Sequence, residues 1–139
     1  MTVPGRLFVF ALLLSIAACS SNTPAAPTTS SAPYSQTDLV VGTGATALAT
    51  SSVTVSYTGW LYDTSKTDGK GTQFETSPSS TFLISQVIAG WRQGVPGMKV
   101  GGSRRLIIPP ELAYGSAGSA PKIPPNATLV FDIGLLAVQ

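Results

Sequence analysis

The sequence predicts an α+β domain in which an antiparallel β-sheet packs against one short α-helix. Residues 53–61 alternate strictly between a face with Val53, Val55 and Leu61 and a polar face, the pattern of a half-buried strand. Residues 128–136 end the domain with a second alternating strand. Only residues 87–94 suit a helix. Several strands with one helix are typical of the α+β class.

The segment between these strands is predicted to contain a loop and two shorter strands. Residues 62–73 are polar and contain two glycines, which indicates a loop. Residues 74–77 and 80–84 have strand-like composition, and Pro78 lies between them. Because proline has no backbone N–H to donate, we expect the strand to be broken there.

The helix and the second half of the domain follow from glycine and proline positions. The helix over 87–94 should end at the residue before Pro96, since proline disfavours helical geometry in its predecessor. Gly101 and Gly102 turn the chain into a further strand over 104–108. Residues 109–125 are rich in Gly, Ser and Pro, which indicates either a long ordered loop or a disordered segment.

The first 18 residues are predicted to be a signal peptide. Arg6 supplies a positive charge, and the apolar run 7–18 spans only about 18 Å as a helix, too short for a bilayer core of about 30 Å. The run ends in Ile16-Ala-Ala-Cys19, which resembles the lipobox of bacterial lipoproteins. We therefore expect cleavage before Cys19 and lipidation of its thiol. The alternative is an ordinary secretory signal that happens to contain a cysteine.

Three regions divide the chain: the signal peptide 1–18, a lipidated cysteine with a tether over 19–36, and one domain over 37–139. The tether contains Ser, Thr, Ala and Pro without a charge, so it cannot bury enough apolar area to offset its chain entropy and should be disordered. The expected location is outside the cytoplasm, anchored by lipid to the cell membrane or the outer membrane.

Composition excludes several classes of function. The sequence contains no histidine, which removes Ser-His-Asp triads, histidine metal sites and the usual proton shuttle. Eight Lys and Arg stand against six Asp and Glu without a marked basic face, so nucleic acid is not an expected partner. We expect neither a cofactor nor a metal.

Six motifs, in this order and spacing, resemble the FKBP family of peptidyl-prolyl cis-trans isomerases. They cover nearly the whole domain and read VSYTGWL at 55–61, FETS at 74–77, VIAGW at 87–91, GMKVG at 97–101, IPPELAYG at 108–115 and IPPNATLVFD at 123–132. The resemblance implies a twisted antiparallel sheet curled around one short helix, in agreement with the fold class above. It also implies an isomerase that assists the folding of exported proteins, acting as a monomer.

The resemblance assigns a substrate pocket with Trp91 as its floor. Its walls would be Phe74, Phe82, Val87, Ile88, Ile123 and Phe131, and its catalytic side chains would be Tyr57, Glu75 and Tyr114. Tyr114 would direct its hydroxyl at the substrate, with the Ile88 N–H as a second donor. Glu75 stands where the family usually has aspartate and should accept a hydrogen bond from Tyr57. Because Glu75 follows Phe74, the two side chains should point in opposite directions unless the strand bulges.

Such a pocket suits proline isomerisation physically. The X-Pro bond is nearly balanced between cis and trans, and exchange is slow because of a barrier of about 18–20 kcal/mol. Twisting the amide breaks its resonance and makes it less polar, so an aromatic, poorly hydrated pocket favours the twisted form. The implied partners are proline-containing segments and, as possible inhibitors, macrolides of the rapamycin type.

Other interpretations remain open at the level of sequence. Trp91, Phe82 and Phe131 could be ordinary core residues of any small β-domain. The domain could also bind proline-containing partners with little turnover, or belong to a surface adhesin without a pocket. Three departures from the family pattern bear on the choice: Glu75, the long 62–73 loop, and serines at positions 80 and 119 where aromatic and histidine side chains are common.

Overall fold

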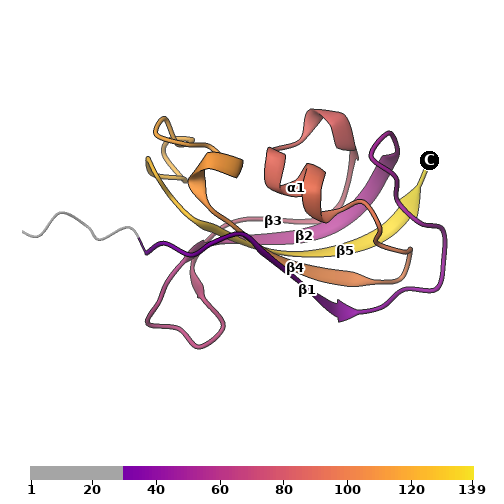
Figure 1. Cartoon of the computed structure of the whole chain (residues 1–139), viewed down its shortest axis with the longest axis horizontal. Helices are drawn as coiled ribbons and strands as arrows, with labels where there is room; N and C mark the ends of the chain where they lie inside the picture. The colour runs from indigo at the N-terminus through magenta and orange to yellow at the C-terminus, as the bar shows by residue number, and fades with distance from the viewer. Residues whose placement is uncertain (1–29) are drawn as a thin grey trace, which may run out of the picture.

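The computed structural model describes residues 30–139; the predicted signal peptide, Cys19 and the tether up to residue 29 lie outside this range. The described chain forms one five-stranded antiparallel sheet in the order β1-β4-β5-β2-β3 (Figure 1). The strands are β1 (Ser35–Val40), β2 (Ser52–Tyr62), β3 (Lys70–Leu83), β4 (Ser103–Ile108) and β5 (Leu129–Val138). The predicted α+β class is confirmed.

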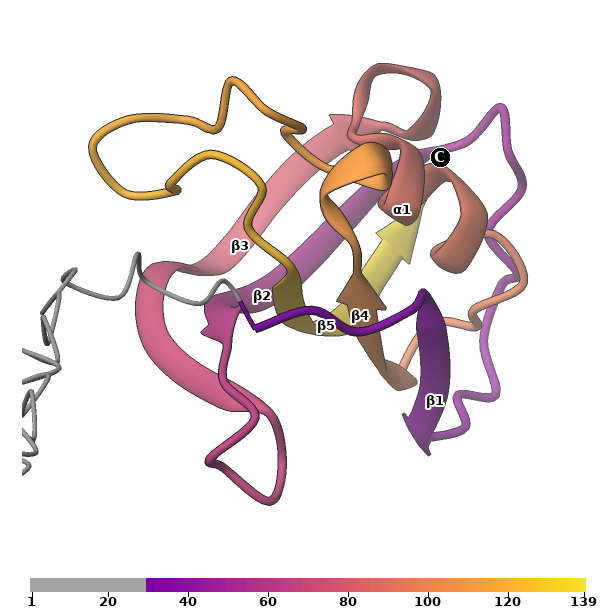
Figure 2. The same ribbon diagram turned by 60° about the vertical axis from the view of Figure 1, so that its left-hand side comes forward.

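One short helix, α1 (Ala89–Gly94), lies against a single face of the twisted sheet (Figures 1 and 2). Two single 3-10 turns, η1 (Ile84–Gln86) and η2 (Pro110–Leu112), flank it in the chain. No helix within residues 30–139 is long and apolar enough to cross a membrane. The core therefore lies between the sheet and α1.

The two strands predicted from alternation have the expected faces. In β5 the four alternating side chains Leu129, Phe131, Ile133 and Leu135 are at most 4% exposed. Val53 and Val55 of β2 lie beside them in the core, at 1% exposure or less. Period-two alternation thus predicted the central strands correctly because alternate side chains of each strand pack in the core, although β5 also buries Val130 on its other face.

The structure corrects the prediction for β3, which is one strand of 14 residues rather than two short ones. Tyr57 pairs with Ser77 and Val55 pairs with Ser80, so the chain accommodates Pro78 in a bulge with one extra residue. Because β3 is an edge strand and Pro78 lies in the bulge, its pairing with β2 continues on both sides of the proline. The loop before β3 is correspondingly shorter than predicted and turns at residues 63–69.

β1 was not predicted, and it begins two residues before the expected start of the domain at 37. It pairs with β4 from Ser35 opposite Ile107 to Val40 opposite Ser103. All six side chains of β1 are exposed, so the strand has no hydrophobic periodicity for sequence analysis to detect. Backbone pairing with β4 stabilises β1, and Tyr34 just before it packs against the core.

Two glycines allow α1 to lie close to β4. A Cβ atom at Gly90 would lie 2.4 Å from the Ile108 side chain, and one at Gly94 would lie 2.5 Å from Leu106. The helix starts at Ala89, two residues later than predicted, and its end at Gly94 agrees with the expectation from Pro96. This close approach positions Trp91, between the two glycines, against the sheet.

The buried side chain of Arg104 connects the end of α1 to β1 by hydrogen bonds. Arg104 of β4 is 9% exposed, and its Nη1 donates to the carbonyl of Gly94 at 2.8 Å. Its Nε donates to Asp38 of β1 at 2.5 Å, and this hydrogen bond lowers the pKa of Asp38. The helix carbonyl that α1 leaves unpaired at its end is therefore satisfied by a charged donor.

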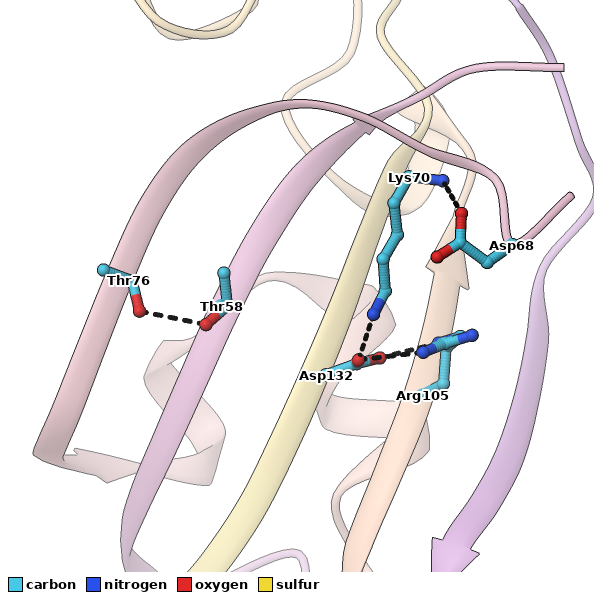
Figure 3. Close-up of polar contacts among 6 residues, drawn as sticks. All are labelled: Thr58, Asp68, Lys70, Thr76, Arg105 and Asp132. Atoms are coloured by element: carbon cyan, nitrogen blue, oxygen red, sulfur yellow. Dashed lines mark hydrogen bonds and ion pairs between the residues drawn. The ribbon is translucent and has the colours of Figure 1, made fainter. Parts of the chain in front are cut away.

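The opposite face of the sheet carries a cluster of ion pairs around Asp132 (Figure 3). Lys70 Nζ lies 2.7 Å from the Asp132 carboxylate, and Arg105 donates to it from Nε at 2.7 Å and Nη2 at 2.9 Å. Burial of the carboxyl opposes ionisation, but the hydrogen bonds and charges of both cations outweigh it and keep the pKa of Asp132 below its usual range. Asp132 thereby connects β3, β4 and β5.

Asp132→Asn should lower the free energy of unfolding by about 1–3 kcal/mol near pH 7, because two cations lose their partner. A carboxyl whose pKa is depressed by folding stabilises the protein above its unfolded pKa of about 3.9, and this contribution disappears as the pH falls through the lower folded value. Urea unfolding should therefore show a constant difference from wild type at pH 6–8 that shrinks below about pH 4. Glu111→Gln, at an exposed carboxyl outside this cluster of ion pairs, serves as control; a difference independent of pH would contradict the interpretation.

Candidate active site

A cavity of about 420 Å³ lies between the sheet, the segment around α1 and the loop after η2. Its lining residues are Tyr57, Glu75, Phe82, Gln86, Val87, Ile88, Trp91, Tyr114 and Phe131. Eight of the ten residues predicted for the pocket are therefore gathered around one space. Phe74 and Ile123 do not line it, and Gln86, which sequence analysis missed, does.

Trp91 closes the bottom of this cavity and is only 5% exposed. Three rings meet its indole edge to face: Tyr57 at 5.2 Å and 85°, Phe82 at 5.7 Å and 87°, and Phe131 at 5.3 Å and 90° between centroids and planes. Edge-to-face pairs add to the stability gained from burial and fix the rings relative to one another. The result is a rigid aromatic enclosure open on one side.

A bulge in β3 places Phe74 and Glu75 toward the same side of the sheet. Gly59 pairs with Glu75 and Trp60 pairs with Gln73, so Phe74 is an extra residue without a partner. Bulges re-aim side chains in this way. Glu75 therefore lines the cavity, while the ring of Phe74 packs edge to face on Phe131 at 5.6 Å, behind the cavity wall.

Sequence analysis did not assign Gly59 to the site, but this arrangement requires a glycine at that position. A Cβ atom at Gly59 would lie 2.6 Å from Cζ of Phe74 and 2.8 Å from Cε1 of Phe131. The two rings occupy the space that a side chain would need. A glycine inside a clearly alternating strand often marks such a close approach, and this signal was available in the sequence.

The loop over 109–125 is ordered, which resolves the two alternatives left by its composition. Ser119 and Ile123 exchange backbone hydrogen bonds at 2.8 and 2.9 Å, and the N–H of Gly118 donates to the carbonyl of Tyr114. Ile123 is 6% exposed and belongs to the core, so it supports the loop instead of lining the cavity. The loop presents Tyr114, 40% exposed, at the cavity mouth.

Two tyrosine hydroxyls face the cavity as protonated donors. Burial, followed by the negative charge and hydrogen-bonding contact of Glu75, raises the pKa of Tyr57 to about 12. Burial and then the charge of Glu75 also raise the pKa of Tyr114. Glu75 is itself exposed. The predicted hydrogen bond from Tyr57 to Glu75 is not among the side-chain hydrogen bonds formed within residues 30–139, so Glu75 acts on the pKa of Tyr57 chiefly through its negative charge, after burial.

A further donor is the backbone N–H of Ile88 at the start of α1. The Ile88 carbonyl accepts from the N–H groups of Trp91 at 3.0 Å and Arg92 at 3.1 Å, whereas its own N–H makes no hydrogen bond within residues 30–139. Since Ile88 lines the cavity, this N–H is available to a ligand. No group of three His, Cys, Asp or Glu side chains capable of holding a metal is found in the same part of the chain.

Glu75→Gln should lower the pKa of Tyr57 below its present value of about 12, because the neighbouring negative charge disfavours the phenolate. The pKa should stay above 10, since burial, the larger cause, remains. Spectrophotometric titration of the tyrosines, with Tyr57→Phe to assign the signal, measures the shift. Glu111→Gln, an exposed carboxylate outside the cavity, is the matched control and should leave the titration unchanged; equal shifts in both variants would contradict a local effect.

Known proteins match this chain over most of the described domain. The sequence model of the FKBP-type peptidyl-prolyl cis-trans isomerases matches residues 44–136. An FK506-binding protein of Neisseria meningitidis serogroup A is 44% identical over 107 residues, covering 73% of this chain and 92% of that protein. FK506-binding protein 4 of Dictyostelium discoideum is 48% identical over 104 residues, 72% of this chain, but the match spans only 27% of its own length.

A solved structure shows the same fold. The crystal structure of a peptidyl-prolyl cis-trans isomerase from Pseudomonas syringae pv. tomato superimposes with a TM-score of 0.66 at 37% identity, covering 76% of this chain and 75% of that one. The structure of FkpA from Escherichia coli gives a TM-score of 0.65 at 41% identity, covering 76% of this chain and 48% of that one. The aromatic cavity described above thus lies in a fold that proline isomerases share.

Proposed function

The chain belongs to the family of FKBP-type peptidyl-prolyl cis-trans isomerases, and from this premise we propose that it isomerises X-Pro bonds in exported proteins while anchored to a membrane by lipid. The observation that carries the catalytic part is the aromatic cavity closed by Trp91. The anchoring part is supported by Ile16-Ala-Ala-Cys19 and by the length of polar chain that follows it.

In the proposed mechanism the substrate proline ring enters the cavity and rests on the indole of Trp91. The surrounding rings of Tyr57, Phe82 and Phe131 exclude water from the X-Pro amide. The planar amide is polar and loses hydration there, while the twisted amide loses less because its resonance is broken. Each 1.4 kcal/mol of preference for the twisted form accelerates isomerisation about tenfold.

Two donors hold the substrate backbone during rotation. The free N–H of Ile88 lies at one wall of the cavity, and the Tyr114 hydroxyl lies at its mouth. The raised pKa of Tyr114 keeps this hydroxyl protonated at neutral pH, so that it donates. The rotation itself transfers no proton, which agrees with the absence of histidine from the sequence.

Tyr114→Phe should reduce kcat/KM for a proline-containing peptide by about two- to tenfold, the value of one hydrogen bond of 0.5–1.5 kcal/mol. Its melting temperature should stay close to that of wild type because the ring is kept and Tyr114 is 40% exposed. Tyr34→Phe removes a hydroxyl outside the cavity that donates to Gln36 at 3.0 Å, and should leave turnover unchanged. Unchanged turnover in Tyr114→Phe would remove this hydroxyl from the mechanism.

The family relationship also makes a macrolide of the FK506 or rapamycin type a candidate inhibitor, since it would compete for the same cavity. A wild-type chain that binds such a macrolide but isomerises peptides no faster than buffer would instead be a binding module for proline-containing partners. Measuring both properties on one preparation separates the two functions.

Lipid anchoring is tested by Cys19→Ala. The wild-type protein should fractionate with membranes, since two or more acyl chains give stable attachment where one binds only marginally. The variant should accumulate as an uncleaved precursor or appear in the soluble fraction. Ser20→Ala changes the adjacent residue without removing the thiol and should behave as wild type. A soluble wild-type protein would contradict the proposed anchor.

A further inference from the structure

A second cavity of about 430 Å³ lies at the end of the sheet formed by β2, β3 and the start of β5. Its lining residues are Ser30, Leu61, Tyr62, Asp63, Thr64, Gly71, Thr72, Pro124, Ala127 and Thr128. We propose that this cavity is a substrate subsite that selects a cationic or hydrogen-bond-donating side chain about four residues from the isomerised proline. The inference rests on the isomerase function proposed above.

One face of β2 contributes a side chain to each cavity. Tyr57 lines the first cavity and Leu61 the second, and the side chains of alternate residues on a strand share a face. At about 3.3 Å per residue the two positions are about 13 Å apart. Between them Phe74 covers Gly59, where no side chain projects. An extended peptide with its proline on Trp91 would therefore reach the second cavity about four residues away.

The second cavity contains one charged side chain, Asp63. Its Oδ1 accepts hydrogen bonds from the N–H of Ser65 at 2.8 Å and from the Ser65 hydroxyl at 2.7 Å. Its Oδ2 accepts no hydrogen bond within residues 30–139. These bonds to Ser65 lower the pKa of Asp63, so the carboxylate is ionised at neutral pH. A free carboxylate oxygen at the cavity wall is an acceptor for lysine, arginine or an amide donor.

Buried polar groups without partners point to the same two cavities. In residues 30–139 only Trp91 Nε1 and Thr128 Oγ1 are buried side-chain polar atoms that lack a hydrogen bond. Trp91 lines the first cavity, and Thr128, 2% exposed, lines the second. Unsatisfied buried groups are uncommon and often mark places where a ligand or water belongs. The second cavity therefore shares with the first a feature that the rest of the described domain lacks.

The test measures isomerisation of ten-residue peptides that carry lysine, norleucine or glutamate four residues before or after a single proline, using the purified full chain. On one side of the proline, kcat/KM should be about two- to fivefold higher for lysine than for glutamate, the range of an exposed ion pair, with norleucine between them. Asp63→Asn should abolish this preference and leave turnover of a peptide too short to reach the cavity unchanged.

Asp68→Asn is the matched control. Asp68 lies in the same loop, and its Oδ1 likewise accepts a backbone hydrogen bond, from Lys70 at 3.1 Å, but it does not line the cavity. It should keep the preference for lysine. Equal turnover of all three peptides on both sides of the proline, or an equal loss of preference in both variants, would overturn the subsite while leaving the isomerase intact. Absence of turnover for every peptide would overturn the isomerase function as well.

Discussion

Trp91→Ala is expected to lower the free energy of unfolding by about 3–5 kcal/mol. The indole is 5% exposed and meets three aromatic rings edge to face, so its removal leaves a hole that the rigid sheet beneath α1 cannot fill. Chemical denaturation monitored by circular dichroism measures the change. Isomerase activity should fall in parallel because the support under the substrate proline is lost.

Trp60→Ala is the control for Trp91→Ala, because it removes a tryptophan that does not line the cavity. Trp60 is half-buried on the opposite face, where Lys70 Nζ lies 4.2 Å from its ring centroid. Its removal should cost about 1 kcal/mol or less, in line with a cation–π contact at a partly exposed site. Trp91→Phe keeps an aromatic floor and should recover most of the stability. If Trp91→Ala were no less stable than Trp60→Ala, the aromatic enclosure would not be part of the core.

Gly90→Ala is expected to destabilise the protein by about 1–3 kcal/mol, the usual range for overpacking a core. In an exposed helix the same change would stabilise by up to about 1 kcal/mol, because alanine is the better helix former. Here the added Cβ would lie 2.4, 2.6 and 2.8 Å from three atoms of Ile108, which is fully buried and cannot move aside. The predicted sign is therefore opposite to that of helix propensity.

Gln93→Ala in the same helix is the control for Gly90→Ala. Gln93 is exposed, so its replacement should be neutral or slightly stabilising. Because α1 must retreat from β4 in Gly90→Ala, Trp91 should shift and kcat/KM should fall even at temperatures where the variant is fully folded. A Gly90→Ala protein with wild-type stability and turnover would show that the contact with Ile108 is not tight.

The sequence predicted those strands whose alternate side chains pack in the core. β2 and β5 lie in the middle of the sheet next to the core, so their alternation follows directly from burial. β1 has no buried side chain and is specified by pairing with β4, which no local pattern reveals. Pro78 was interpreted as a break because its effect depends on whether the strand lies at an edge, and that is a property of the whole sheet.

The site was predictable as a set of residues but not as a geometry. The family motifs identified the residues around the cavity, whereas the exact role of Phe74 depends on a bulge whose register is set by β2. Ile123 was assigned to the wall and instead lies in the core beneath the loop. Gln86 and Asp63 escaped notice because a single polar residue in a turn carries no signal until the fold brings it to a cavity.

The irregular register of β3 has a consequence for solubility. A 14-residue strand at the edge of a sheet presents a long row of unpaired backbone groups, on which a strand of another molecule could add and begin aggregation. In β3 this row is interrupted at three places, where its pairing with β2 shifts, and Pro78 lies at one of them. An incoming straight strand could match only a few residues at a time. The bulge that brings Glu75 to the cavity therefore also protects the domain from edge-to-edge association.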